Sequence, residues 1–158
     1  MINKTLARRY AFQFLYHFQL PEFSEYRNQL CDLDPSEYRD IIDEGLNLFD
    51  QSISEVDEEV SGDPLSNQER DYSIKLILGI LENEESLKEK ISAHLRKTSL
   101  EKIENVEKTI LLVGVYEILY VDDVPPKVSL SEAIKIAQEF GTEQSYAFVN
   151  GVLDNFVK

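Results

Sequence analysis

The chain has 158 residues, of which 42% are hydrophobic and 29% are charged. This composition is typical of a globular protein, and the length predicts one domain over residues 1–158 that buries roughly 70% of its unfolded surface. A single cysteine, Cys31, excludes an internal disulfide framework and fits a reducing compartment. No apolar run is long enough to span a membrane, and no signal-peptide cleavage site follows the N-terminus. We therefore expect a cytoplasmic protein without membrane contact.

The charge is unevenly distributed along the chain. The net charge of −14 opposes autonomous binding to nucleic acid, because phosphate is repelled by an acidic surface. Residues 1–20 nevertheless carry +3, from Lys4, Arg8 and Arg9, whereas residues 21–69 carry −13. A basic tip on an acidic body hints at a local site for an anion. The alternative is that three bases near an N-terminus have no function.

Hydrophobic periodicity predicts helices throughout the first half. Residues 4–20 form an amphipathic pattern that Pro21 ends, and residues 22–33 suit a short helix or an irregular link. Asp34 can cap a further long helix, with Pro35 at its first position. The sequence Ser61-Gly62-Asp63-Pro64 is predicted to end it.

The second half continues the helical pattern. Residues 66–95 are predicted to form a helix that bends near Asn83, and residues 99–121 are apolar nearly all round, which predicts the central and most buried helix. Gly114 inside that segment indicates a close helix contact. The S-x-x-E sequence Ser129–Glu132 predicts a capping box at the start of a helix, and Gly141 predicts that this helix ends in a left-handed backbone conformation. A last helix is predicted over about 143–157. The fold class is therefore all-α, a compact bundle of six to seven helices.

Catalytic and metal-binding patterns are absent from the sequence. The two histidines, His17 and His94, and the lone cysteine have no zinc-ligand spacing, and no phosphate-binding glycine loop or nucleophile elbow occurs. Adjacent acids such as Glu84 and Glu85 point in different directions on a helix, which makes them poor acid–base pairs. We expect a protein that is not an enzyme and that has no metal and no cofactor.

The C-terminal third resembles a known family. It contains V-E-K at 106–108, Y-E at 116–117, V-P-x-K-V at 124–128, E-A-I at 132–134 and F-V-N-G-V-L-D at 148–154. The first helix adds Ala7-Arg8-Arg9, Ala11 and Leu15-Tyr16. Together these motifs resemble the transcription antitermination factor NusB family over about residues 6–154.

The resemblance implies a fold of two packed helical sub-bundles and a function in transcription. Members are expected to bind the boxA element of single-stranded RNA jointly with the ribosomal protein NusE. The pair loads a processive antitermination complex on RNA polymerase, notably on ribosomal RNA operons. A homodimer that buries the partner surface is also possible for this family. NusB-like domains also occur fused to RNA methyltransferases. Because this chain ends four residues after Asp154, we do not expect a cofactor-binding domain.

The resemblance also assigns roles to individual residues. The residues that it implies for RNA binding are Lys4, Arg8, Arg9, Tyr16, Lys127 and Phe148, and the acid that it places toward NusE is Glu107. Basic side chains on phosphate and aromatic faces on bases are the usual means of holding single-stranded RNA. Structural readings stay open for Tyr16 and Phe148 as core residues and for Glu107 as a surface acid. For Asn150-Gly151 we expect a buried hydrogen bond and a close helix contact in preference to RNA contact.

This sequence departs from the family pattern where positive charge is usual. The basic arm is short, and Leu112, Gln138 and Ala147 replace common Arg or Lys residues. Fewer phosphate contacts predict weaker binding to RNA and a smaller salt dependence. The alternative function is therefore a divergent protein-interaction module in which RNA binding is weak or lost.

Overall fold

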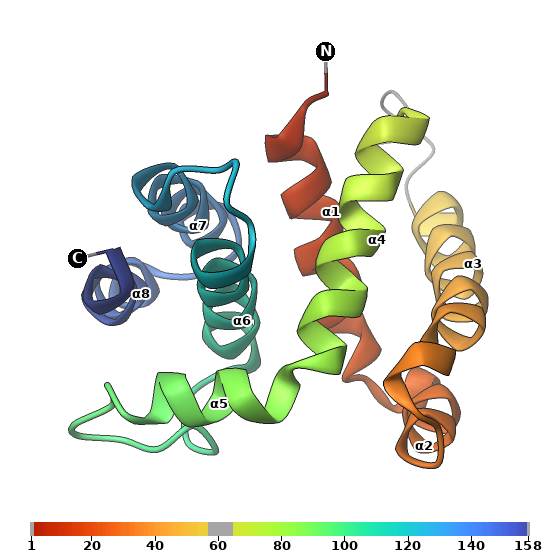
Figure 1. The fold of residues 1–158 in the computed structure, drawn as a ribbon, viewed down its shortest axis with the longest axis horizontal. Coiled ribbons are helices and arrows are strands. Elements are labelled where there is room, and N and C mark those ends of the chain that lie inside the picture. Colours follow the sequence, from red (N-terminus) through yellow and green to blue (C-terminus); the bar gives the residue numbers. More distant parts are fainter. Residues whose placement is uncertain (1, 57–64, 158) are drawn as a thin grey trace. The chain divides into compact units, whose positions relative to one another are not determined.

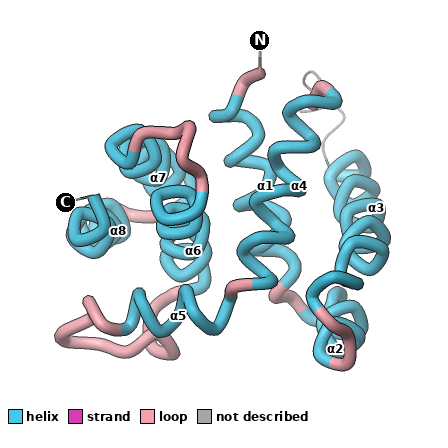
Figure 2. Tube along the Cα trace, viewed as in Figure 1, coloured by secondary structure: helices cyan, strands magenta, loops and turns pink. Residues whose placement is uncertain are grey.

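The computed structural model describes residues 2–56 and 65–157, and in this part of the chain helices are joined by loops and turns without any strand (Figure 2). Two 3-10 turns, Pro21–Phe23 and Pro35–Glu37, accompany eight α-helices within the described residues. The helices are α1 Lys4–Phe18, α2 Ser24–Cys31, α3 Tyr38–Val56, α4 Asn67–Glu82, α5 Glu84–Ser92, α6 Asn105–Tyr120, α7 Pro126–Phe140 and α8 Glu143–Val157 (Figure 1). The all-α prediction is confirmed. The number exceeds six or seven because the pattern over 66–95 divides at Asn83 into α4 and α5.

The helices belong to two compact units, Met1–Leu78 and Gly79–Lys158. Helix α4 begins in the first unit, and its last turn belongs to the second. The stop predicted for the third helical pattern at 61–64 lies outside the described residues.

Aromatic side chains form the core of the first unit. The Phe14 ring lies 5.3 Å from Phe18, 6.2 Å from Phe23 and 5.7 Å from Phe49, measured between ring centroids. These four rings come from α1, α3 and the turn that follows α1, and all are at most 3% exposed. Edge-to-face and tilted pairs of this kind add to the free energy gained by burying apolar surface. This cluster fixes the face that α1 turns toward α3.

Helix α1 ends two residues before the predicted end. Its last residue is Phe18. Two residues separate this end from Pro21, which begins a 3-10 turn. The guanidinium of Arg27 donates hydrogen bonds to the carbonyls of Phe18 and of Leu20, the latter at 2.9 Å. The Phe18 carbonyl at the end of α1 is thus satisfied by a side chain from α2.

The starts of α1 and α4 are joined by one carboxylate. Ser66 and Glu69 form a reciprocal capping box, with the Glu69 amide donating to Ser66 Oγ at 3.2 Å and the Ser66 amide donating to Glu69 Oε2 at 2.8 Å. The Asn3 amide donates to Glu69 Oε1 at 3.2 Å, and Asn3 Oδ1 accepts from the Leu6 amide at 3.1 Å. Hydrogen bonds to the ionised carboxylate hold the pKa of Glu69 below its usual value.

A polar cluster joins α1, α3 and α4 farther along the first unit. The Tyr10 hydroxyl donates to Asp50, and Arg70 Nη1 lies 3.3 Å from Asp50 Oδ2. Burial raises the pKa of Tyr10 above its usual value, and the neighbouring Asp50 carboxylate adds to that effect. The cluster therefore holds three helices together through a neutral phenol and an ion pair.

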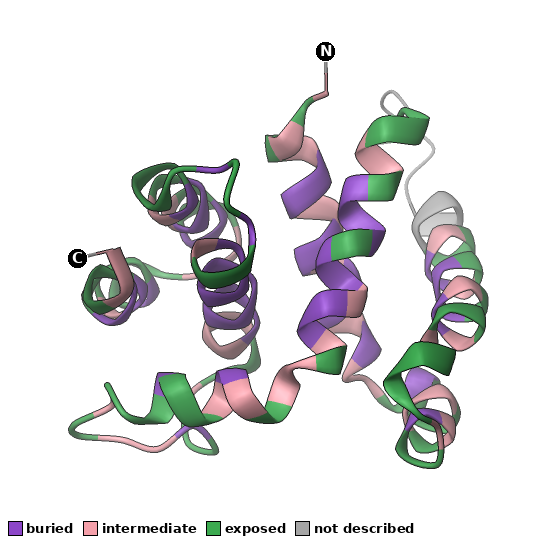
Figure 3. Ribbon diagram, in the orientation of Figure 1, coloured by how far each residue is buried: buried purple, intermediate pink, exposed green. Residues whose placement is uncertain are grey.

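Helix α6 is the central helix of the second unit, as predicted. Every residue from Thr109 to Glu117 is buried (Figure 3). A Cβ added at Gly114 would lie 3.0 Å from Leu153 Cδ1 and 3.6 Å from Ala133 Cβ, so the predicted close helix contact is confirmed. Helices α7 and α8 pack on α6 at this point.

Two predictions about helix termini in the second unit are wrong. Helix α7 begins at Pro126, so Ser129 and Glu132 lie inside it and form no capping box. Proline is favoured at the first helical position because its missing N–H has no partner there. Gly141 has φ −110° and ψ −161°, which is extended and not left-handed. Glycine fits there because a Cβ would lie 2.7 Å from Ser145 Cβ and 2.9 Å from the Ala137 oxygen.

No described helix is both long and apolar enough to cross a lipid bilayer. Among the described residues, no three His, Cys, Asp or Glu side chains are grouped so that they could hold a metal ion.

The two histidines make contacts within the fold. His17 Nδ1 lies 2.7 Å from the Gln13 carbonyl oxygen, and the His94 ring centroid lies 4.9 Å from that of Phe156. The exposed Cys31 is a free thiol.

Candidate nucleic-acid interface

The basic residues of the N-terminus lie on the first two turns of α1. Lys4 occupies the first turn, which contains no acid, and Arg8 and Arg9 occupy the second. The positive end of the helix dipole is at this terminus, where a cation is typically unfavourable by 0.3–1 kcal/mol. These two turns therefore concentrate positive charge at the start of α1.

The three cations differ in how far solvent reaches them. Arg8 is only 4% exposed, so its guanidinium belongs mainly to the interior in this structure. Lys4 is half-buried, with Nζ 5.3 Å from the centre of the Tyr72 ring on α4. Arg9 is half-exposed. Of the two adjacent arginines, Arg9 is therefore the one placed to meet a ligand.

A half-exposed stripe runs along α1 from Arg9 to Tyr16. Residues 9, 13 and 16 follow the i, i+4, i+7 spacing that aligns side chains on one helix face, and all three are of intermediate exposure. The Tyr16 ring stacks on Phe12 at 6.3 Å with an interplanar angle of 25°. Gln13, which belongs to none of the sequence motifs, adds an amide between the cation and the ring. The spacing alone was the signal that could have identified it.

Lys127 lies on the first turn of α7 in the second unit and is exposed. Two residues later, Ser129 Oγ donates to Glu117 Oε1 on α6 at 2.6 Å, and both residues are at most 2% exposed. This buried bond fixes the start of α7 against the end of α6. The position of Lys127 therefore depends on a hydrogen bond in the core.

Helix α8 carries the F-V-N-G motif with its polar part turned outward. Phe148 is half-buried, whereas Asn150 and Gly151 are exposed. A Cβ added at Gly151 would meet no atom within 4 Å. The expected buried hydrogen bond of Asn150 and the close helix contact at Gly151 are therefore wrong, since these two residues lie on the exposed face of α8.

Glu107 connects the start of α6 to the start of α8. Its Oε1 accepts a hydrogen bond from Ser145 Oγ at 3.2 Å, and Ser145 is 2% exposed. The Ser145 amide in turn donates to Thr142 Oγ1 at 3.2 Å, which caps α8. Glu107 is half-buried, and its carboxylate supports the fold where α6 and α8 begin.

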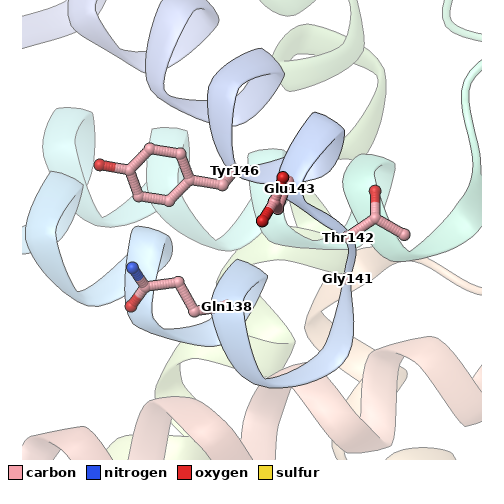
Figure 4. A pocket seen from close by; sticks show the side chains of 5 residues that line it. All are labelled: Gln138, Gly141, Thr142, Glu143 and Tyr146. Carbon is pink, nitrogen blue, oxygen red and sulfur yellow. The ribbon is translucent and has the colours of Figure 1, made fainter.

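The positions that lack the usual positive charge lie in different environments. Leu112 is 5% exposed and packs in the interior, while Gln138 and Ala147 are exposed. Gln138 borders a surface hollow of about 480 Å³ at the turn from α7 to α8 (Figure 4). The lining residues are Gln138, Gly141, Thr142, Glu143 and Tyr146. Because Glu143 is the only charged side chain among them, this hollow does not attract phosphate.

The predicted residues thus fall into both units. Lys4, Arg8, Arg9 and Tyr16 belong to α1 in the first unit, whereas Glu107, Lys127 and Phe148 belong to α6, α7 and α8 in the second. Within the first unit, Arg9 and Tyr16 share one stripe. Lys127 and Phe148 lie on successive helices joined by a short turn.

Comparison with known proteins identifies the family. The NusB family profile matches residues 5–158. A transcription antitermination protein NusB from Oceanobacillus iheyensis is 42% identical over 113 residues, which is 70% of this chain and 89% of the relative. The structure of T. maritima NusB matches with a TM-score of 0.71 and 28% identity, covering 99% of this chain and 92% of the other.

A further likeness concerns the fold alone. A crystal structure of the antitermination factors NusB and NusE in complex with dsRNA matches with a TM-score of 0.66 at 21% identity, covering 97% of this chain and 94% of the other. The profile match extends over nearly the whole chain and includes every residue assigned above except Lys4. This chain therefore belongs to the NusB family.

Proposed function

We propose that this chain is a transcription antitermination factor that binds boxA-type single-stranded RNA together with the ribosomal protein NusE. The observation that carries the proposal is the family match over residues 5–158, because the relatives bear the name of transcription antitermination proteins. The protein acts without catalysis, in the cytoplasm, as part of the complex that keeps RNA polymerase processive on ribosomal RNA operons. The solved complex of NusB, NusE and dsRNA, whose NusB has this fold, supports the partnership.

The α1 stripe supplies the chemistry for RNA in this proposal. Arg9 contacts phosphate, Gln13 hydrogen-bonds a base or a sugar, and the Tyr16 ring stacks on a base. Phe12 lies behind Tyr16, so the ring is already held in a stacked arrangement before RNA binds. Lys127 on α7 adds a second phosphate contact.

The acidic charge of the chain suits the protein partner. Residues 21–69 carry −13, and a ribosomal protein such as NusE is expected to be basic. Complementary charge raises the rate of association and selects the partner. Glu107, which is half-buried at the start of α6, contributes to this contact.

Titration of boxA RNA with the chain alone and with the chain plus NusE tests the proposal. The expected result is weak binding by the chain alone, because the net charge is −14 and basic positions are few, and much tighter binding when NusE is present. Equal affinity with and without NusE would contradict the proposed joint binding.

Replacement of Arg9 by Ala tests the α1 stripe. Arg9 is a sharper target than Arg8, whose burial would mix a loss of stability with any loss of binding. One lost phosphate contact is expected to reduce the salt slope of RNA binding by about 0.7. Arg39→Ala is a matched control, because Arg39 is exposed on α3 and pairs locally with Asp43 at 3.3 Å.

A second candidate function is a protein-interaction module that has lost RNA contact. The buried Arg8 and the apolar Leu112 favour it, since neither offers charge to an RNA in this structure. Under this reading the chain still binds NusE, but Arg9→Ala leaves the affinity of the chain–NusE complex for boxA unchanged. The same titrations therefore separate the two functions.

A further inference from the structure

The turn between α6 and α7, with its flanking residues, forms a rigid corner that we define as residues 119–128. Val121 is 2% exposed and Val124 is 4% exposed, so two valines anchor the turn in the core. The Val124 amide donates to the Val121 carbonyl at 3.3 Å, which closes the turn. The other residues of the corner are exposed (Figure 3). A surface held in this way is ordered before any ligand arrives.

The corner concentrates the exposed apolar surface of the protein. Tyr120 and Val128 are each 42% exposed, and Leu119 is 40% exposed. In the described part of the chain, one other large hydrophobic residue, Tyr146, is comparably exposed. Single exposed apolar residues are normal, but a group of them at one place marks a contact surface.

Tyr120 is the residue of this group whose position is fixed. Its ring stacks on that of Tyr116 with centroids 5.1 Å apart and an interplanar angle of 20°. Tyr116 is 8% exposed and lies against Gly79, where no side chain could fit. The buried ring therefore supports the exposed one, and Tyr120 loses little conformational freedom when a flat ligand stacks on it.

One lysine lies beside the Tyr120 ring, and a second belongs to the same corner. Lys90 Nζ on α5 lies 5.6 Å from the ring centre, and Lys127 is exposed seven residues farther along the chain on the first turn of α7. Asp122 and Asp123 are exposed between them. The corner as a whole is therefore not strongly basic, and attraction to phosphate alone would not hold a ligand there.

We propose that this corner is a stacking site for one base of a single-stranded RNA. The base lies on the Tyr120 ring, Lys90 swings from the ring to an adjacent phosphate, and Lys127 contacts the next phosphate. An exposed, supported aromatic ring beside movable cations is the combination that binds single-stranded nucleic acid, and the balancing acids leave most of the affinity to stacking. This inference rests on the proposed function for its ligand. It adds Tyr120 and Lys90 to the residues that the family resemblance supplied.

Replacement of Tyr120 by Leu, compared with replacement by Phe, tests the stacking. Both variants are titrated with boxA RNA in the presence of NusE. Tyr120→Leu is expected to weaken binding by about 5- to 150-fold, and Tyr120→Phe is expected to bind as the unchanged protein does, because Phe retains the ring. The salt slope stays constant in both variants, since no phosphate contact is lost. Lys90→Gln and Lys127→Gln each reduce that slope by about 0.7.

Tyr146→Leu is the matched control, because Tyr146 is a similarly exposed tyrosine of the same unit, on α8. Circular dichroism and urea unfolding verify that each variant is folded. Photocrosslinking of RNA that carries a photoreactive base is expected to join the RNA to a peptide containing Tyr120.

Three results would overturn the inference, and they are distinguishable. If the unchanged chain with NusE does not bind boxA, both the proposed function and the stacking site fail. If it binds but Tyr120→Leu has the same affinity, only the stacking site fails. If Tyr120→Leu weakens binding to NusE in the absence of RNA, the corner is a surface for the protein partner instead.

Discussion

Ser129 on α7 donates a hydrogen bond to the carboxylate of Glu117 on α6, and both side chains are buried. The bond is 2.6 Å long, which is within the normal range for a hydroxyl donor and an oxygen acceptor. It links two helices at the corner that presents Lys127 and Tyr120. A core interaction thereby orders the surface on which the proposed RNA contacts of the second unit depend.

Ser129→Ala is expected to lower the free energy of unfolding by about 1–3 kcal/mol, because a buried carboxylate oxygen loses its donor. Urea unfolding monitored by circular dichroism measures the change. Ser131→Ala is the control, since Ser131 is exposed on the same helix and its replacement is expected to have little effect. Equal stability of the two variants would show that the Glu117 carboxylate finds another donor.

Gly79→Ala is expected to be strongly destabilising. A Cβ at this position would lie 2.0 Å from the Tyr116 hydroxyl oxygen and 2.2 Å from its Cζ, so the ring must move. Overpacking of this kind typically costs about 1–3 kcal/mol. Because Tyr116 supports Tyr120, the variant is also expected to weaken RNA binding. A thermal midpoint equal to that of the unchanged chain would contradict the close contact.

Gly151→Ala is expected to have the opposite effect on stability. The position is exposed inside α8, and an added Cβ meets no atom within 4 Å. Alanine is favoured over glycine in a helix interior by about 1 kcal/mol, so the free energy of unfolding should rise by up to that amount. Urea unfolding tests this directly. A loss of NusE or RNA binding in a stabilised variant would indicate that a partner approaches the backbone at Gly151.

The stability of the first unit is expected to fall in acid through Glu69. Hydrogen bonds from the Ser66 and Asn3 amides hold the pKa of Glu69 below its usual value of 4.5. A group whose pKa is lower when folded contributes stability above its unfolded pKa and loses it as the pH falls through the folded one. Glu69→Gln should therefore be less stable than the unchanged chain at neutral pH, with a smaller difference in acid. Thermal midpoints across the acid range measure the difference, and a constant gap would contradict the linkage.

The sequence by itself determined the helical class and the place of the central helix. Apolar residues on nearly every side of 103–119 can be buried only when other helices surround them, so the pattern predicts α6 directly. Gly114 was correctly assigned to a helix contact for the same reason. The residues assigned to RNA and NusE came from motifs and stay predictions, because the sequence contains their identity but not their surroundings.

Only the tertiary structure decided which polar residues face inward. The motifs assign the same role to the adjacent arginines Arg8 and Arg9, yet Arg8 is 4% exposed whereas Arg9 is half-exposed. Their exposure differs because adjacent residues point 100° apart on a helix. Ser129 and Glu132 matched a local capping pattern, but the hydroxyl is used by Glu117, twelve residues away. Asn150 and Gly151 were expected inside and lie outside. Local rules describe a helix and its ends, whereas the partner of each side chain depends on which segments distant in the sequence pack against it.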